Sequence, residues 1–322
     1  NKDDWPGKFE DIPGVFAFII SNISKVQLVN ILVNKKSEHK KIINKLKSFG
    51  TKISNIRLIN CKTDRSWVRD SLPIFIKIKK NKKILSNWEF NAWAKYKNFK
   101  KDNKAYLKIK RATKIKVIKP KFKRKKIILE GGSIDVNGNG LLLTTKQCLL
   151  SKIQERNKGF KMKDYEIIFK KFFGINKVIW LNKGIVGDDT HGHVDDIARF
   201  VDKNKIFVAK ESNKKEKNFK NLSENIKILK KYKNKNIKKL KIVPIPMPKP
   251  KKIKGIRVPA SYLNFYIANK IVLVPVFKDP KDKIVLRIFK RHFKSRKIVP
   301  VDCSVLVWGF GTIHCLTQQE PI

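Results

Sequence analysis

The chain has 322 residues, of which 41% are hydrophobic and 10% aromatic, and this is enough apolar material for a sizeable core. Intrinsic disorder is therefore excluded as the dominant state. No stretch approaches 18 consecutive uncharged apolar residues, so no membrane-spanning helix and no membrane partner are expected. The sequence begins without Met or a signal peptide, and we expect it to start within a longer gene product.

The formal net charge is +50, from 76 Lys and Arg residues against 26 Asp and Glu residues. Only 11 of the basic residues are Arg, whereas proteins that read nucleic acids rely on Arg to grip phosphates and guanine edges. Lys is spread along nearly the whole chain together with abundant Ile and Asn, and all three have A/T-rich codons. The charge therefore indicates a solvated Lys surface, with incidental polyanion binding as the alternative.

Short runs rich in β-branched residues predict strands over residues 26–33, 56–61, 72–78, 127–129, 141–145, 178–181, 198–201, 206–208, 242–245, 271–276 and 304–308. Helical patterns lie between them, over residues 38–49, 148–157, 165–173, 224–232 and 280–292. Several strands are continuously apolar, which is typical of strands buried on both faces. The alternation of strands and helices predicts an α/β fold. The run Asn-Gly-Asn-Gly at residues 137–140 predicts a tight hairpin.

The stretch over residues 210–241 is rich in Lys and Asn and is followed by four Pro residues, the last of them Pro250. This composition predicts an insertion or loop over residues 210–255. Strands of the same character continue beyond it, so we expect one domain over residues 1–322.

The four cysteines are Cys61, Cys148, Cys303 and Cys315. None forms a CxxC pair, and no His and Cys residues have zinc-like spacing, because His191 and His193 are only two positions apart. Four cysteines are too few for a disulfide framework in a chain of this length, which favours a reducing, cytoplasmic setting. We expect the first three cysteines to be small core residues.

Four segments concentrate the rarer residues: residues 67–73, 130–133, 187–196 and 309–319. Taken singly, an Asp before a strand is commonly a turn residue, and a Gly pair commonly marks a bulge. Taken together, the four segments contain many of the chain's few acidic residues and histidines, beside Gly-rich turns at strand ends. Functional sites of α/β folds commonly lie at such strand ends. These side chains are Asp70, Glu130, Asp188, Asp189, Asp195, Asp196, His191 and His193.

A Cys, a His and several carboxylates allow nucleophilic catalysis. An acyl-transfer triad needs one carboxylate, however, and here at least three compete for one pocket. Buried carboxylates are costly unless a cation pairs with them, and the substrate is one source of such a cation. A guanidinium suits this role because it is planar, always charged, and offers five donors that carboxylates bind in pairs.

The segments Trp-Val-Arg-Asp, Glu-Gly-Gly-Ser, Gly-His-Val-Asp and Ile-His-Cys-Leu-Thr-Gln-Gln resemble, in order and spacing, the motifs of agmatine deiminases. Residues 89–93 and 260–266 also resemble segments of this family, which belongs to the guanidino-group-modifying superfamily. The resemblance runs from about residue 5 to the C-terminus. It implies the pentein fold, a five-bladed α/β propeller with pseudo-fivefold ββαβ units around a central site.

The resemblance also implies the chemistry: hydrolysis of agmatine to N-carbamoylputrescine, a putrescine precursor, and ammonia, without a metal or organic cofactor. It implies Cys315 as the nucleophile, His193 as the acid and base, Asp70 and Asp195 as the guanidinium clamp, Glu130 as the residue that orients His193, Trp67 as an aromatic cover, and Asp189 as a further substrate contact.

The neighbouring residues are expected to play supporting parts. We expect Arg69 to be the buried partner of a carboxylate, and His314 to point away from Cys315 on the opposite face of a strand. The remaining polar residues are expected to cap turns or to form the outer part of the pocket: His191, Asp188, Asp189 and Asp196.

The sequence departs from the family at three positions, with Leu72 and Phe310 where Gly is usual and Thr312 where Asn is common. The family's first segment is also expected to be missing. These departures leave open another guanidine substrate (arginine, peptidyl-arginine or methylarginine), or a non-catalytic nucleic-acid-binding protein on this fold. No specific nucleic-acid partner is expected, and a homo-oligomer remains open.

Overall fold

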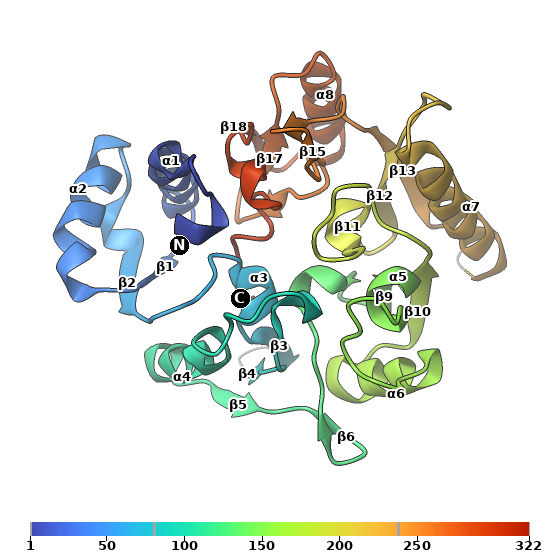
Figure 1. Ribbon diagram of the computed structural model, residues 1–322, viewed down its shortest axis with the longest axis horizontal. Coiled ribbons are helices and arrows are strands. Elements are labelled where there is room, and N and C mark those ends of the chain that lie inside the picture. The colour runs from blue at the N-terminus through green and yellow to red at the C-terminus, as the bar shows by residue number, and fades with distance from the viewer. Residues whose placement is uncertain (1, 80–81, 237–238, 322) are drawn as a thin grey trace.

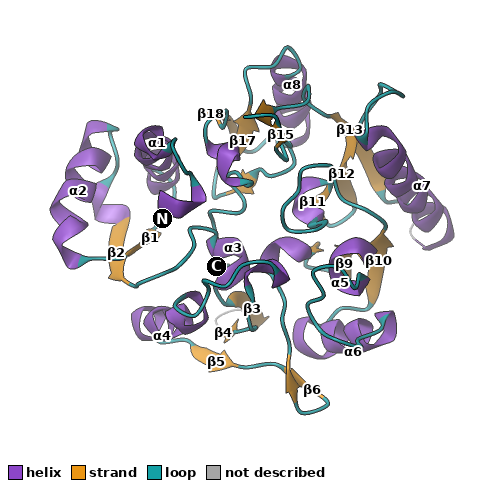
Figure 2. Ribbon diagram, in the orientation of Figure 1, coloured by secondary structure: helices purple, strands orange, loops and turns teal. Residues whose placement is uncertain are grey.

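The computed structural model describes residues 2–79, 82–236 and 239–321. Its α-helices are α1 (Ile12–Ser24), α2 (His39–Ser48), α3 (Val68–Ser71), α4 (Asp102–Thr113), α5 (Lys146–Leu150), α6 (Met162–Phe173), α7 (Asn218–Asn236) and α8 (Asp282–His292). Figure 2 shows how these helices and the strands alternate along the chain. The predicted α/β class is confirmed by this alternation.

Four three-stranded sheets share one topology. They are β3 (Ile74–Lys79), β4 (Lys82–Ser86) and β5 (Lys116–Ile118); β8 (Asp135–Val136), β9 (Leu141–Thr145) and β10 (Lys177–Leu181); β11 (Ala198–Asp202), β12 (Lys205–Lys210) and β13 (Lys241–Pro246); and β16 (Tyr266–Ile267), β17 (Ile271–Val276) and β18 (Lys297–Asp302). In each, the middle strand is antiparallel to the first strand and parallel to the third. A helix connects the middle strand to the third, so each sheet is one ββαβ unit.

A further pair, β1 (Val29–Val33) and β2 (Ile56–Asn60), is parallel and has α2 between its strands. Figure 1 shows this pair and the four ββαβ units arranged around the middle of the molecule, with the C-terminus near that middle. Two short hairpins lie outside the units: β6 (Lys121–Phe122) with β7 (Lys125–Lys126), and β14 (Lys252–Ile253) with β15 (Ile256–Arg257).

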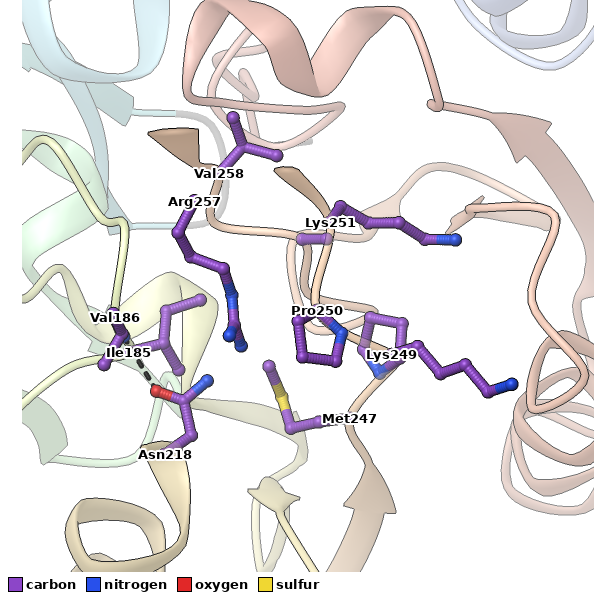
Figure 3. A pocket seen from close by; sticks show the side chains of 11 residues that line it. Ile185, Val186, Asn218, Met247, Lys249, Pro250, Lys251, Arg257 and Val258 are labelled. Atoms are coloured by element: carbon purple, nitrogen blue, oxygen red, sulfur yellow. Dashed lines mark hydrogen bonds between the residues drawn. The ribbon is translucent and has the colours of Figure 1, made fainter. Parts of the chain in front are cut away.

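The prediction of an insertion or loop over residues 210–255 is wrong for most of that stretch. Residues 218–236 form α7, because Leu222 and Leu229 recur at helical spacing among the Lys residues and are fully buried. Pro244 and Pro246 lie in β13, an edge strand, where a missing N–H is tolerated. Figure 3 shows the chain after β13 lying beside Asn218, whose Oδ1 accepts a hydrogen bond from the Val186 N–H at 2.8 Å.

Three other predictions need correction. Residues 304–308 are not a strand, since a short 3₁₀ helix, Leu306–Gly309, follows β18 there. Residues 127–129 make only an isolated bridge, between Glu89 and Ile128. The helix expected over residues 148–157 is only the short α5. In the first two cases a short apolar run does not by itself distinguish a strand from a buried turn. The hairpin at residues 137–140 is confirmed, because β8 and β9 pair across it.

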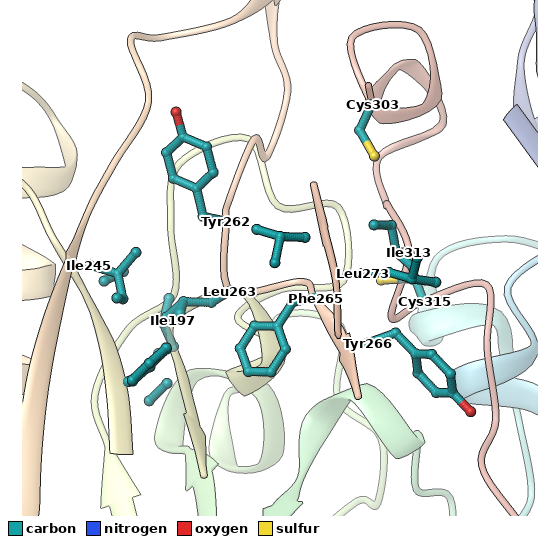
Figure 4. Packing of buried hydrophobic residues seen from close by; sticks show 14 of the residues in the cluster. Ile197, Ile245, Tyr262, Leu263, Phe265, Tyr266, Leu273, Cys303, Ile313 and Cys315 are labelled. Carbon is teal, nitrogen blue, oxygen red and sulfur yellow. The ribbon is translucent and has the colours of Figure 1, made fainter. Parts of the chain in front are cut away.

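The main core forms where the units pack against one another. Figure 4 shows part of it, in which Phe265, Leu273, Ile313 and Cys315 belong to one cluster of buried residues. Phe265 meets Phe289 of α8 edge to face, with 5.0 Å between the ring centroids. The nucleophile predicted from the sequence therefore lies at the border of a rigid apolar core. Among the described residues, none of the helices is both long and apolar enough to cross a membrane.

Candidate active site

The predicted site residues lie in short turns that immediately precede the first strands of the units. Asp70 is in α3, before β3; Glu130 precedes the 3₁₀ turn Gly131–Ser133, before β8; and Asp195 is in the 3₁₀ turn Val194–Asp196, before β11. The Cys315 segment joins them, because the Arg69 N–H donates to the Cys315 carbonyl at 3.1 Å. Equivalent turns of different units thus meet near the middle of the molecule.

Gly132 lies where these groups converge. A Cβ on Gly132 would fall 2.6 Å from His193 Nδ1, 2.8 Å from Asp70 Oδ1 and 3.1 Å from Asp195 Oδ2. No larger residue fits without displacing one of these three polar groups. The structure therefore brings Asp70, His193 and Asp195 together around one point, as the family motifs imply, and explains why Gly stands there.

Two donors hold the Asp70 carboxylate. The Gly132 N–H donates to Oδ1 at 2.9 Å, and Trp93 Nε1 donates to Oδ2 at 2.9 Å. Trp93 is presented by a left-handed turn in which Ala92, Trp93 and Ala94 all have positive φ (50°, 59° and 53°). Three such residues in succession are strained, and strain of this kind persists where the surroundings impose it. Burial raises the pKa of Asp70.

Glu130 has a protein partner that the sequence did not reveal. Arg156 Nε donates to Glu130 Oε1 at 2.8 Å, and both side chains are fully buried. Burial opposes ionisation of Glu130, but Arg156 and then His193 outweigh it and lower the pKa to about 2. Glu130 Oε2 lies 3.9 Å from His193 Nε2, on the side of the ring opposite Asp70.

His193 lies between the two carboxylates. Its Nδ1 is 3.8 Å from Asp70 Oδ2, and its side chain is about 1% exposed. Burial would lower its pKa, but Asp70 first, and then Cys148 and Glu130, raise the pKa well above the ordinary value. Asp188 fixes the backbone by accepting hydrogen bonds from the N–H groups of Gly192 (2.7 Å) and His193 (3.0 Å). Asp188 is thus a turn cap, as expected.

Asp195 and His314 form a close pair, which corrects the expectation for His314. The His314 Nδ1 lies 2.7 Å from Asp195 Oδ2, because residues 313–316 form a turn and not a strand with alternating faces. Burial raises the pKa of Asp195 to about 7. Burial, together with Arg199 and Arg69, lowers the pKa of His314 well below its ordinary value. His314 is therefore a neutral imidazole beside the predicted guanidinium clamp.

The Cys315 thiol lies among hydrogen-bonding and acidic groups. Its Sγ is 3.1 Å from Asn264 Nδ2 and 3.8 Å from Asp195 Oδ2. Burial raises its pKa well above the ordinary value, and Asp195, Asp196 and Asp70 add to the effect. In the free protein this thiol is therefore protonated at neutral pH.

Trp67 packs beside the thiol. A Cβ on Gly311 would meet the Trp67 ring at 2.7 Å and Cys315 Cβ at 3.1 Å, so the missing side chain allows this approach. The ring also packs against Trp5, with 5.1 Å between centroids. Trp67 is 5% exposed and forms a buried wall of the site.

Arg69 differs from its expected role. It pairs with no carboxylate within salt-bridge distance among the described residues; its Nε donates to the His314 carbonyl at 3.2 Å and its Nη1 to Gln319 Oε1 at 2.5 Å. Burial, together with Arg199, lowers its pKa to about 10. Arg69 therefore holds the segment that carries Cys315.

The three departures from the family have clear structural outcomes. Leu72 has φ −88°, an ordinary extended value, so no positive φ is needed there. Phe310 has φ +64°, a left-handed conformation that Gly adopts more readily. Thr312 Oγ1 donates to Asn264 Oδ1 at 2.8 Å and so helps to fix the amide beside Cys315.

Other predicted residues lie around this centre. Asp189 accepts hydrogen bonds from Tyr96 Oη at 2.6 Å and from Lys95 Nζ. The Asp196 Oδ1 accepts from Asn264 Nδ2 at 3.1 Å. His191 Nε2 lies 3.0 Å from Ser151 Oγ.

All three cysteines expected in the core are buried in hydrophobic clusters. Cys61 and Cys303 are buried core residues, as predicted. Cys148 is also buried, but its Sγ lies with ligand atoms of Glu130 and His193, all within 4.8 Å of one another. Cys148 therefore borders the site as well as the core, and these three residues could hold a metal ion.

Three residues at the site were missed as functional: Trp93, Asn264 and Arg156. Trp93 and Asn264 lie in the segments 89–93 and 260–266, whose family resemblance was the available signal. No local motif marks Arg156 as a functional residue. The one available sign is that Arg is rare in this chain, with only 11 Arg residues among many Lys residues.

The comparisons with known proteins agree with this geometry. The sequence matches the Porphyromonas-type peptidyl-arginine deiminase family over residues 1–321. A Legionella pneumophila protein, provisionally named agmatine deiminase, is 31% identical over 95% of this chain and 85% of its own length.

Two solved structures are also similar. The agmatine deiminase of Enterococcus faecalis has a TM-score of 0.89 at 26% identity, with 100% of this chain and 90% of that chain covered. A cysteine-to-serine variant of C. jejuni agmatine deiminase with substrate bound has a TM-score of 0.83 at 28% identity, with 95% and 86% covered. The chain therefore belongs to the Porphyromonas-type peptidyl-arginine deiminase family, together with the agmatine deiminases, and shares their α/β pentein fold.

Proposed function

We propose that this protein is an agmatine deiminase, which hydrolyses agmatine to N-carbamoylputrescine and ammonia. One observation carries the proposal, namely that the buried Cys315 thiol lies 3.8 Å from an Asp195 carboxylate oxygen. The side chains of Asp195, Asp70 and His193 in turn converge on the space beside the α-carbon of Gly132. Two carboxylates facing one thiol need a cation, and a guanidinium supplies one with donors for both. Relatives over most of the chain are named agmatine deiminases.

The bound cation also accounts for the reactivity of the thiol. Burial and the nearby carboxylates raise the pKa of Cys315, so the free site disfavours the thiolate. A guanidinium between Asp70 and Asp195 neutralises these charges and places its own charge beside the sulfur. Substrate binding therefore lowers the pKa of the thiol and releases its proton, which confines reactive thiolate to the complex.

The reaction then proceeds in two halves. The Cys315 thiolate attacks the guanidinium carbon and forms a C–S bond, which gives a tetrahedral adduct. Protonated His193 donates its proton to one amino nitrogen of the adduct, and the C–N bond to this nitrogen breaks. Ammonia departs, and a thiouronium remains covalently bound to Cys315. Neutral His193 next takes a proton from water, and the oxygen attacks the same carbon to give a second tetrahedral adduct. The C–S bond then breaks and the hydroxyl proton of the adduct passes to solvent, which releases the ureido product and the thiolate and leaves His193 protonated again.

Three further residues support these steps. Glu130, held ionised by Arg156, faces His193 Nε2 and favours its protonated form. The buried Trp67 ring shields the sulfur from water. Asp189 binds the distal amine of agmatine, which replaces the Lys95 ammonium as its partner. The Lys95 side chain is 43% exposed and free to move away.

We further propose a single domain over residues 1–322, in which the β1–β2 pair is the fifth blade around this site. The pair repeats the βαβ half of the other units, with α2 in the connecting position. The turns before β3, β8 and β11 contribute Asp70, Glu130 and Asp195, which is what a ring of equivalent units would do.

The test is ammonia release from agmatine, arginine, a peptidyl-arginine and methylarginine. The proposal is supported if the wild type hydrolyses agmatine and Cys315→Ala does not. Cys303→Ala is the matched control, because Cys303 is another buried cysteine and lies in the core, and this variant should retain activity. Turnover of another guanidine instead would reassign the substrate. Turnover that persists in Cys315→Ala, or none with any of the four, would contradict the proposed function.

A further inference from the structure

A group of potential metal ligands lies against the acid–base histidine on the side away from Asp70. Glu130, Cys148 and His193 each offer one ligand atom, and these atoms all lie within 4.8 Å of one another. The three residues come from separate segments, since Cys148 is in α5 and the other two precede the turns before β8 and β11. The fold, not local sequence, therefore assembles a thiol, an imidazole and a carboxylate.

Two of these ligand atoms are unsatisfied. Glu130 Oε2 and His193 Nε2 are buried without a hydrogen-bond partner among the described residues, and they lie 3.9 Å apart. Both side chains are at least 99% buried. Buried polar atoms are normally hydrogen-bonded, so these two unpartnered atoms, which face each other, are placed to bind one shared ligand. A water or a cation would satisfy both.

The spacing and chemistry of these ligand atoms fit zinc. Ligand atoms of a tetrahedral zinc site lie roughly 3.3–3.6 Å apart, given zinc bond lengths of about 2.0–2.3 Å. The observed separations, all within 4.8 Å, therefore need to contract by at most about 1.5 Å, which side-chain rotations can supply. Thiolate, imidazole and carboxylate form a ligand set that zinc binds, and the fourth position is left for water.

The surroundings orient the ligands. Arg156 holds the other oxygen, Glu130 Oε1, at 2.8 Å, and Asp70 faces the other ring nitrogen of His193 at 3.8 Å. A carboxylate behind a metal-bound histidine is a common supporting contact. The Arg156 charge opposes a dication, but the charges of Glu130, Asp70 and a Cys148 thiolate outnumber it.

We propose that Zn²⁺ binds to Glu130 Oε2, Cys148 Sγ and His193 Nε2 and thereby inhibits the enzyme. The Cys148 thiol loses its proton on binding, and His193 must be neutral to coordinate. A metal-bound His193 has no proton to give to the leaving nitrogen, so deimination stops. Only the inhibition rests on the proposed function; metal binding does not.

The binding test uses Co²⁺ as a spectroscopic probe for the Zn²⁺ site in the metal-free protein. We expect one Co²⁺ per chain with a thiolate-to-cobalt absorption band, and Zn²⁺ should displace it. Cys148→Ser should lose the band and weaken Zn²⁺ binding at least about tenfold. Cys315→Ser and Cys303→Ser should keep the band. A band lost in Cys315→Ser but kept in Cys148→Ser would overturn the proposal.

A second measurement needs no variant. Anomalous diffraction from wild-type crystals soaked in Zn²⁺ should show a peak between the three ligand atoms. A peak at Cys315 only, at surface residues only, or none would overturn the site. In activity assays, Zn²⁺ should inhibit the wild type at least about tenfold more strongly than Cys148→Ser. If Co²⁺ binds as expected but no guanidine is hydrolysed, the metal site stands and the proposed function fails.

Discussion

Arg156 donates from its Nε to Glu130 Oε1 at 2.8 Å, and neither side chain is exposed to solvent. This pair keeps a carboxylate ionised directly behind the histidine of the site, although burial alone would favour its neutral form. The sequence showed Glu130 in a recognisable motif but gave no sign of its partner. The pair therefore decides the electrostatics of the site.

Arg156→Ala is expected to destabilise the protein by about 3–5 kcal/mol, because it leaves the Glu130 charge buried without a cation. Urea unfolding measures this loss. The double variant Arg156→Met, Glu130→Gln removes both charges and should recover a large part of the stability while remaining inactive. Equal stabilities for Arg156→Ala and the double variant would contradict the explanation.

The pH dependence of kcat/KM should follow Asp195, whose pKa is about 7. Below that pH the carboxyl is neutral and binds the guanidinium weakly, so kcat/KM should rise about tenfold per pH unit and level off above pH 7. Asp195→Asn should abolish this limb. An unchanged limb in Asp195→Asn would assign the ionisation to another group.

The same pKa has the opposite consequence for stability. Because the pKa of Asp195 is raised above its unfolded value of 3.8, its contribution to stability is present at low pH and is lost as the pH rises through about 7. The free energy of unfolding of Asp195→Asn, relative to the wild type, should therefore increase between about pH 4 and pH 7. Urea titrations at several pH values measure the difference, and a constant difference would refute it.

Trp93→Phe removes the indole N–H that donates to Asp70 Oδ2 and keeps an aromatic ring in place. A hydrogen bond to a charged group contributes about 1.5–3 kcal/mol, so kcat/KM should fall roughly 10- to 100-fold. Trp88→Phe is the matched control, because the buried Trp88 Nε1 has no partner among the residues described, and it should retain activity. Similar losses in both variants would indicate a packing effect.

Phe310 adopts φ +64°, so glycine should be the better small residue at this position. Both Phe310→Gly and Phe310→Ala lose the contact of the ring with the core, but only Ala keeps the strained backbone. We expect the Gly variant to be more stable than the Ala variant by about 1 kcal/mol, the reverse of their usual order. Thermal or urea unfolding of the two variants decides this.

The net charge of +50 should repel the proposed substrate agmatine, a dication, at long range and slow its encounter with the site. Turnover at substrate concentrations well below KM should therefore rise with added salt, since charges are screened over about 8 Å at physiological ionic strength. Turnover at saturating substrate is the control and should change little. A flat or falling profile at low substrate would mean that the Lys surface does not govern access.

Much of the fold and the site could be predicted because their signals are local. The strand β9 matched its predicted range, and α6 and α8 lie close to theirs, because periodicity and apolar runs specify such elements directly. The missed strands β4, β5 and β18 are rich in Lys or contain Pro, and only pairing with a neighbouring strand makes them strands. Pairing across long sequence separations leaves no local pattern.

The residues available for chemistry can be identified from the sequence, because Cys315, His193 and the acidic residues stand in four short motifs amid a uniform background of Lys, Ile and Asn. The partners that hold these side chains in place come from the fold. Arg156 reaches Glu130 over 26 positions, and His314 reaches Asp195 over 119. A buried charge takes whichever partner the fold brings within hydrogen-bonding distance, and that distance is set by the packing of the units, not by the order of residues along the chain.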